Sequence, residues 1–122
     1  MRTLTIAVCT GALMFAAAAR AQDAKHGAKV FATYCAMCHS TQAGRNVMGP
    51  SLHGVVGRKA GTVAGFNYSP AMQTSGVVWN EASLDSYLAA PKTFVPKNRM
   101  SFPGLPAARD RADLIAFLAS QK

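Results

Sequence analysis

Two thiols and an imidazole lie within the five consecutive residues Cys35-Ala36-Met37-Cys38-His39. In a helical turn, residues three and four apart share a face, so these three side chains converge on one patch. This spacing is typical of sites where two cysteines bind a c-type haem covalently and the histidine ligates its iron. The motif therefore predicts a haem protein, with attachment through Cys35 and Cys38 and ligation by His39.

Three other kinds of site use the same residue types, and the rest of the chain disfavours them. A thioredoxin-type redox pair is expected near a βαβ pattern, which is missing, and its chemistry gives the histidine no role. A structural zinc site needs four ligands, but the remaining histidines, His26 and His53, are not paired. A plain disulfide is compatible with an exported protein but leaves His39 unexplained.

Residues 1–21 have the pattern of a secretory leader. An apolar, alanine-rich run extends from Leu4 to Ala19 and is followed by Arg20 and the small residue Ala21. The run falls short of the ~20 residues that a membrane-spanning helix needs. We therefore expect a signal peptide that is cleaved after about Ala21, with no stable membrane insertion, and a mature domain of residues 22–122.

The mature domain is small and basic. Arg2 and Arg20 belong to the leader, so 11 of the 13 Lys and Arg residues remain against 5 Asp and Glu, a net charge of +6 with neutral histidines. A domain of this size is marginally stable without a cross-link or a filler for its core, and a covalently held haem supplies both. The positive charge favours acidic protein partners.

Hydrophobic periodicity predicts helices and no strands. We expect a first helix over 23–38 that runs into the haem motif, a second from the cap Asn80 to about Ala90 with Pro91 as its stop, and a last one over 107–120. Glycine and turn signals predict a long loop over 39–78 with a short helix near 69–76, and prolines predict a second loop over 91–106. Such a long loop suggests that a ligand organises it.

Further motifs follow the haem motif in a fixed order. Residues 24–120 contain, in sequence, CAMCH, MGPSLHGVVGRKAG, GFNYS, a single Trp79, YLAAPK, KNRMSFPG and DLIAFL. This ordered set resembles class I cytochromes c of the mitochondrial and alphaproteobacterial (cytochrome c2-like) type. The resemblance implies an all-α cytochrome c fold, with three main helices, short helices and long ordered loops around one covalently attached haem c.

The resemblance also implies roles for individual residues. His39 and Met100 would be the two iron ligands, a pair that gives a high reduction potential. Pro50 would accept a hydrogen bond from His39, and Tyr87 would lie beside the Met100 sulfur. The haem propionates would be bound by three further residues, Arg58, Tyr68 and Trp79.

Met100 has competitors for the role of thioether ligand. Met37 lies within the attachment motif and cannot easily cross to the opposite haem face, while Met48 and Met72 lie in the segment that resembles the propionate side. Prolines stiffen the loop around Met100, which lowers the entropic cost of fixing its side chain. Met100 is therefore the expected ligand.

The two outer helices are expected to cross. By the same resemblance, Gly27 and Phe31 of the first helix would pack against Leu114 and Phe117 of the last, with the glycine allowing close approach. His26, on the first helix, is expected to be exposed.

Two protein ligands on the iron leave no open position for a substrate, which argues against an enzyme. The resemblance thus implies a soluble electron carrier, and the leader indicates the bacterial periplasm. Two alternatives remain open: a haem enzyme or ligand sensor in which the sixth position is open, and a fixed electron-entry subunit of a larger periplasmic dehydrogenase.

The expected partners are acidic redox proteins, such as a dehydrogenase, a bc1-type complex, an oxidase or a reaction centre. Complementary charge would steer them into short-lived complexes at the exposed haem edge. The residues expected to ring that edge are Lys29, Lys92, Lys97, Arg99 and Arg45. We expect a monomer that binds no nucleic acid.

Overall fold

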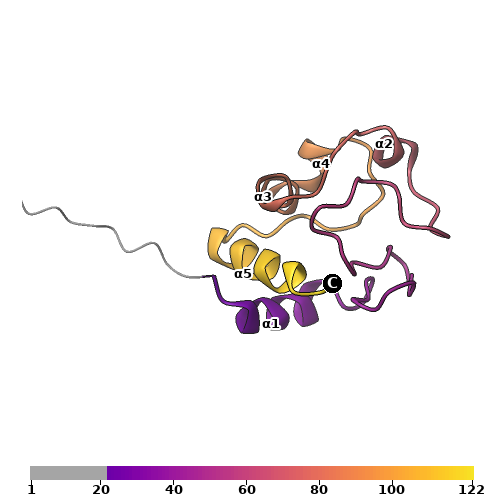
Figure 1. The fold of residues 1–122 in the computed structure, drawn as a ribbon. Coiled ribbons are helices and arrows are strands. Elements are labelled where there is room, and N and C mark those ends of the chain that lie inside the picture. Colours follow the sequence, from indigo (N-terminus) through magenta and orange to yellow (C-terminus); the bar gives the residue numbers. More distant parts are fainter. Residues whose placement is uncertain (1–21) are drawn as a thin grey trace, which may run out of the picture.

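The computed structural model describes residues 22–122, which form helices joined by long loops (Figure 1). In chain order the helices are α1 (Ala24–Tyr34), α2 (Pro70–Gln73), α3 (Glu81–Ala89), α4 (Pro91–Phe94) and α5 (Ala108–Ala119). Within this range, β-type pairing is limited to an isolated bridge between Lys59 and Val78. The predicted all-α fold is confirmed. None of the described helices has the length and apolar character needed to cross a membrane.

Side-chain caps fix where three of the helices begin. The Asp23 side chain accepts hydrogen bonds from the backbone N–H groups of Lys25 and His26 at the start of α1. Asn80 and Ser83 form a reciprocal capping box at the start of α3. Ser69 caps α2. The helix starts predicted at Asn80 and near Ser69 are confirmed, because both residues offer an oxygen to otherwise unpaired N–H groups.

The first helix is shorter than the predicted 23–38. Regular α-helix ends at Tyr34, and Cys35 is its C-cap. The Cys35 carbonyl then accepts hydrogen bonds from the backbone N–H groups of Cys38 at 3.0 Å and His39 at 2.9 Å. The motif is therefore a separate turn rather than a continuation of the helix, and it still keeps the two thiols and the imidazole together.

The predicted loop over 91–106 contains a short helix at its start. Pro91 ends α3, as predicted, but it also occupies the first turn of α4, where its missing N–H leaves no partner unpaired. The prediction was wrong here because one proline serves as the stop of one helix and the start of the next. The rest of the segment, from Val95 to Pro106, is the irregular loop that carries Met100.

Helices α1 and α5 lie side by side (Figure 1), which confirms the predicted crossing. A Cβ added to Gly27 would lie 1.9 Å from the carbonyl oxygen of Asp113 and 2.9 Å from the Cβ of Phe117, so only glycine fits this approach. The rings of Phe31 and Phe117 pack with their centroids 5.4 Å apart. Leu114, in the same helix, is buried.

His26 is half-buried rather than exposed as predicted. Its Nδ1 lies 2.8 Å from Oδ2 of Asp113, and the backbone N–H of Asp23 donates to Oδ1 of the same carboxylate at 2.8 Å. The Asp23 N–H lowers the pKa of Asp113, and His26 and Arg109 add to this effect against the opposing effect of burial. The reason for the error is that this contact joins residues 87 positions apart, which no local pattern reveals.

The Asp113 contact should make stability depend on pH. Because the folded state lowers the pKa of Asp113 below its ordinary 3.8, the stabilisation is present above that pH and is lost as the pH falls through the folded-state value. We expect Asp113→Asn to lower the melting temperature at pH 7 by several degrees. The gap between variant and wild type should close below a pH of about 4. Thermal unfolding monitored by circular dichroism at both pH values checks this.

The control for that experiment is Asp110→Asn. Asp110 lies 3.7 Å from Nε2 of His26 and is partly exposed, so the same chemical change there should have a smaller effect. A gap between Asp113→Asn and wild type that stays constant from pH 7 to pH 3 would show that the carboxylate charge is not what stabilises the contact.

Candidate haem site

A cavity of about 380 Å³ lies between the motif turn, the long loop that follows it, α3 and the loop that carries Met100. Its walls are largely aliphatic and aromatic, with few polar groups, which is typical of sites that hold an apolar cofactor. Every residue that was predicted to contact the haem lines this cavity: Cys35, Cys38, His39, Pro50, Arg58, Tyr68, Trp79, Tyr87 and Met100.

One nitrogen of His39 is fixed by the backbone and the other is free to bind a metal. Nδ1 lies 2.8 Å from the carbonyl oxygen of Pro50. A carbonyl can only accept, so Nδ1 carries the proton and Nε2 presents a lone pair. Burial lowers the pKa of His39, with Arg58 acting in the same direction and the Pro50 contact opposing both. The ring is therefore held in the neutral form that metals require.

Gly49 packs against the His39 ring, a role that the sequence did not reveal because a Gly-Pro pair reads only as a turn signal. A Cβ at this position would lie 2.3, 2.7 and 2.9 Å from Cε1, Nδ1 and Nε2 of His39. The Gly49 N–H also donates to the carbonyl of Cys38 at 2.7 Å. The absence of a side chain at Gly49 thus leaves room for the imidazole.

Gly49→Ala should displace the His39 ring and weaken the hydrogen bond to Pro50. We expect a loss of stability of about 1–3 kcal/mol, as for other overpacked sites, together with a changed haem absorption spectrum. Gly44→Ala is the matched control. Gly44 has open space around it but a φ of 72°, so alanine there strains only the backbone. An unchanged spectrum in Gly49→Ala would show that the ring does not need this space.

The sulfur of Met100 has a polar partner among the residues that line the cavity. The Tyr87 hydroxyl donates to Sδ of Met100 at 3.8 Å. This contact agrees with the prediction that Tyr87 lies beside the Met100 sulfur. Burial raises the pKa of Tyr87 to about 12, so the hydroxyl keeps the proton that it donates. The Tyr87 ring packs against Trp79 with the ring centroids 4.9 Å apart. The Met100 side chain is thus positioned by a buried aromatic cluster.

The three residues predicted to bind propionates lie in the same cavity wall. Nη1 of Arg58 donates to the carbonyl of His53 at 3.1 Å, which orients the guanidinium, and burial lowers the pKa of Arg58. The Tyr68 oxygen accepts from the Val63 N–H at 3.1 Å, so its own proton is free to be donated. Trp79 is buried and adds an indole N–H. Together they offer the donors that carboxylates need.

Cys35 and Cys38 are both free thiols at the cavity. Burial raises the pKa of Cys35 to about 11, and the neighbouring Cys38 adds to the shift. A protonated thiol is a poor nucleophile, so Cys35 is not the activated thiolate of a redox enzyme. Two free thiols at the edge of an apolar cavity fit the formation of two thioether bonds to a haem.

The competing methionines differ in their placement. Met37 is 85% exposed and does not line the cavity, so its thioether cannot act there. Met48 and Met72 both line the cavity, with Met48 74% exposed at its edge and its Sδ 3.9 Å from Sγ of Cys38. Met100 is the methionine that pairs with Tyr87.

The residues present fit a haem: apolar walls, a neutral imidazole, a thioether, two thiols and carboxylate-binding donors. Comparison with known proteins decides the family, because the cytochrome c family model matches residues 24–122. The chain belongs to the cytochrome c family. This cytochrome c is 48% identical over 100 residues to cytochrome c from Cochliobolus lunatus, covering 81% of this chain and 93% of that protein.

Bacterial relatives of this cytochrome c match as well. Cytochrome c2 from Rhodomicrobium vannielii is 46% identical over 123 residues, covering 99% of this chain and 98% of the relative. The solved structure of cytochrome cH from Methylobacterium extorquens is 43% identical, with a TM-score of 0.74, covering 79% of this chain and 96% of that one. The predicted cytochrome c2-like type and the cytochrome c fold are confirmed.

Family membership settles the cofactor and the general activity. This cytochrome c carries one haem c, attached covalently through Cys35 and Cys38. It is an electron carrier and not an enzyme, as the sequence predicted.

Proposed function

We propose that this cytochrome c is a periplasmic one-electron carrier in which the side chains of His39 and Met100 would hold the haem iron. The observation that supports this assignment is that both side chains line one cavity and each is held by its own partner, His39 by the Pro50 carbonyl and Met100 by the Tyr87 hydroxyl. When bound, the haem supplies an iron that changes reversibly between two oxidation states. A His/Met pair favours a high reduction potential.

The chain's own residues keep this site suited to electron transfer. Pro50 holds the His39 ring in one tautomer and one orientation, and Tyr87 keeps a proton directed at the Met100 sulfur. The buried rings of Trp79 and Tyr87 pack together and place aromatic surface beside the Met100 sulfur. Because these contacts fix both ligands in advance, little rearrangement accompanies a change in iron charge.

The proposed periplasmic location rests on the leader pattern. The signal peptide predicted over 1–21 lies outside the described residues. The likeness to cytochrome c2 and to cytochrome cH, both bacterial, supports export of the mature domain over 22–122.

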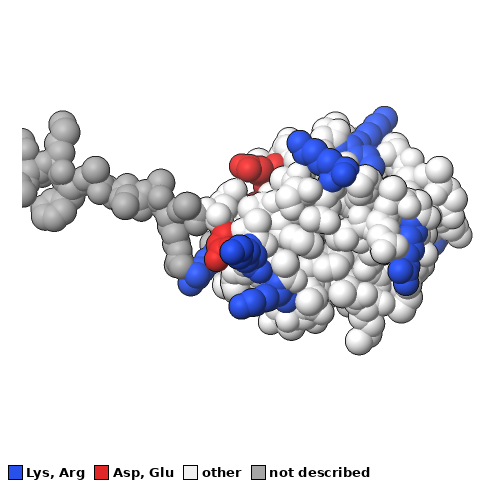
Figure 2. All heavy atoms as spheres, turned by 60° about the horizontal axis from the view of Figure 1, so that its bottom comes forward, with Lys and Arg blue, Asp and Glu red and all other residues white. Residues whose placement is uncertain are grey.

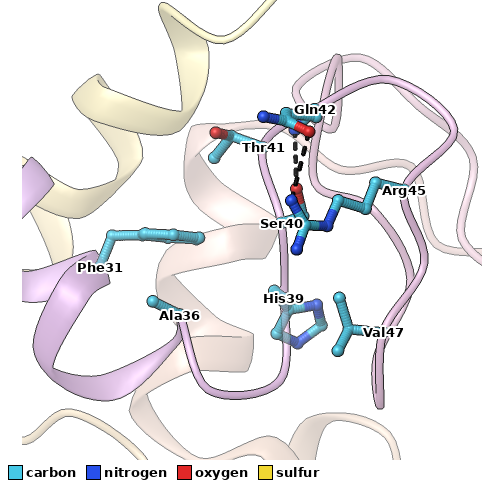
Figure 3. A pocket seen from close by; sticks show the side chains of 8 residues that line it. All are labelled: Phe31, Ala36, His39, Ser40, Thr41, Gln42, Arg45 and Val47. Carbon is cyan, nitrogen blue, oxygen red and sulfur yellow. Dashed lines mark hydrogen bonds between the residues drawn. The ribbon is translucent and has the colours of Figure 1, made fainter.

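The proposed docking surface consists of the basic side chains beside the Met100 loop. Lys92, Lys97 and Arg99 are exposed, and Arg99 also lines the mouth of the haem cavity. Arg45 lines a shallower pocket of about 300 Å³ that reaches the His39 ring, where it points toward Ser40 and Gln42 (Figure 3). Complementary acidic partners would be steered to such a surface.

Charged side chains also lie outside the proposed docking surface. On the face drawn in Figure 2, Lys and Arg side chains lie in separate groups near the periphery, and the middle of that face carries none. Complementary charge raises the rate of association more than the affinity of the complex. We infer short-lived complexes that bury less than about 1,200 Å², as is common for redox encounters.

Reversing charge beside the Met100 loop should slow electron transfer with an acidic redox protein. We expect Lys97→Glu with Arg99→Glu to lower the second-order rate constant about tenfold at low salt. The wild-type rate should also fall as salt shortens the screening length from about 10 Å at 0.1 M to about 3 Å at 1 M. Stopped-flow absorption of the haem measures both effects.

Lys122→Glu is the matched control for docking. Lys122 is exposed at the C-terminal end and does not line the haem cavity. A single charge reversal there should change the rate much less than Lys97→Glu alone. Equal effects at the two positions would show that net charge, and not this surface, governs association.

A further inference from the structure

Asn98 is a buried polar residue whose side chain is fully engaged two positions before Met100. It is 4% exposed. Its Nδ2 donates to the carbonyls of Pro91 and Val95, both at 2.9 Å, and its Oδ1 accepts from the backbone N–H of Met100 at 2.9 Å. One side chain therefore ties the start of α4, its C-cap and the Met100 backbone together.

The backbone next to Asn98 is in an unfavourable conformation that hydrogen bonds must stabilise. Lys97 has a φ of 66°, the only positive φ at a non-glycine residue in the described part of the chain. This left-handed conformation is unfavourable for a residue with a Cβ and persists only where the surroundings enforce it. The ammonium group of Lys92 donates to the Asn98 carbonyl, and the Asn98 N–H donates to the Val95 carbonyl at 3.2 Å.

We propose that Asn98 is a positioning residue that holds the Met100 backbone in place and so sets how readily an external ligand displaces the Met100 sulfur. This inference rests on the proposed role of Met100 as an iron ligand. Without the amide, the Met100 N–H loses its partner and the carbonyls of Pro91 and Val95 each lose one of their two donors, so the loop holds Lys97 less firmly in its strained conformation. The loop then moves, and the thioether moves with it.

The chemistry of the site selects an amide. Only Asn and Gln offer two N–H donors and a carbonyl acceptor in one group, and Gln would carry that amide one methylene farther from the backbone than Asn98 does. Asp in this place would direct a carboxylate oxygen at the carbonyls of Pro91 and Val95, with no proton to donate at neutral pH. Ser or Thr could serve one of the three partners as donor and one as acceptor.

The test is imidazole binding to the oxidised, haem-loaded protein, followed by absorption. Imidazole can bind the iron only after the Met100 sulfur has left, so its apparent affinity reports the stability of the closed loop. We expect Asn98→Ala to bind imidazole about tenfold more tightly than wild type, since a lost buried hydrogen-bond network of this size alters an equilibrium by about that factor. Asn98→Asp should act in the same direction, and Asn98→Ser less strongly.

Asn80→Ala is the matched control. It removes the cap of α3 and so lowers global stability, but it leaves the Met100 loop intact. Its imidazole affinity should stay within about twofold of wild type. If Asn98→Ala and Asn80→Ala raise the imidazole affinity equally, the positioning role is overturned. It is also overturned if the affinity of Asn98→Ala exceeds that of the wild type by no more than the experimental error. Should Asn98→Ala fail to fold, Asn98→Ser decides by the same comparison.

A separate result would overturn the proposed function instead. If wild-type protein binds imidazole as tightly as Met100→Ala does, Met100 is not the ligand, and Asn98 has nothing to position. If the wild type binds imidazole weakly and the Asn98 variants bind it tightly, both proposals are supported. If the wild type and the Asn98 variants all bind imidazole weakly, the role of Met100 as a ligand is supported and the positioning role of Asn98 is rejected.

Discussion

Met100→Ala should open the proposed sixth position of the iron, because among the described methionines Met100 is the one whose sulfur accepts from the Tyr87 hydroxyl. The reduced variant should bind carbon monoxide readily. Its reduction potential should fall, since a donor that favours ferrous iron is lost, by on the order of 100 mV within the ~0.8 V range that axial ligands span. Absorption titration and potentiometry measure the two effects.

The controls for this prediction are the other methionines of the cavity. Met72 and Met48 also line it, so Met72→Ala and Met48→Ala remove a similar volume without removing the proposed ligand. Both variants should keep the wild-type potential and should resist carbon monoxide. A variant at Met72 that binds carbon monoxide as Met100→Ala does would reassign the ligand.

Replacing both thiols should prevent stable folding. The mature wild-type protein should have the mass of residues 22–122 plus one haem that survives acid–acetone extraction. Cys35→Ser with Cys38→Ser should lose that haem. An empty cavity of about 380 Å³ would cost on the order of 9 kcal/mol at about 24 cal/mol per Å³. That cost is comparable with the whole stability of a typical domain.

Mass spectrometry and circular dichroism check this prediction. Because the two serine residues differ from cysteine by one atom each, the loss of structure reports the loss of haem and not a change in packing. A double variant that melts cooperatively near the wild-type temperature without haem would show that the chain alone supplies the core.

Local sequence patterns predicted the parts of the fold that local chemistry determines. Asn80 and Ser69 cap their helices because their side chains reach N–H groups three residues ahead. The end of α1 was predicted too far along the chain because the separate turn from Cys35 to His39 keeps the residue spacing of a helix. α4 was not predicted because Pro91 both stops α3 and begins the next helix.

The sequence predicted which residues form the candidate site but not how their contacts are arranged in space. The resemblance along the whole chain predicted nine residues that contact the haem, and all nine line one cavity. Three contacts escaped prediction: the pairing of His26 with Asp113, the space that Gly49 leaves for His39, and the bonds that Asn98 makes around Met100. The first joins segments far apart in sequence, and the other two depend on where a loop backbone passes, which residue type alone does not specify.

The most direct test of the electron-carrier account is a carbon monoxide titration of the reduced, unmutated protein at neutral pH. If the Met100 sulfur occupies the sixth position, the spectrum should be low-spin and should not change appreciably as carbon monoxide is added. Ready binding by the folded wild-type protein would contradict a closed iron site and would favour a ligand sensor or a haem enzyme.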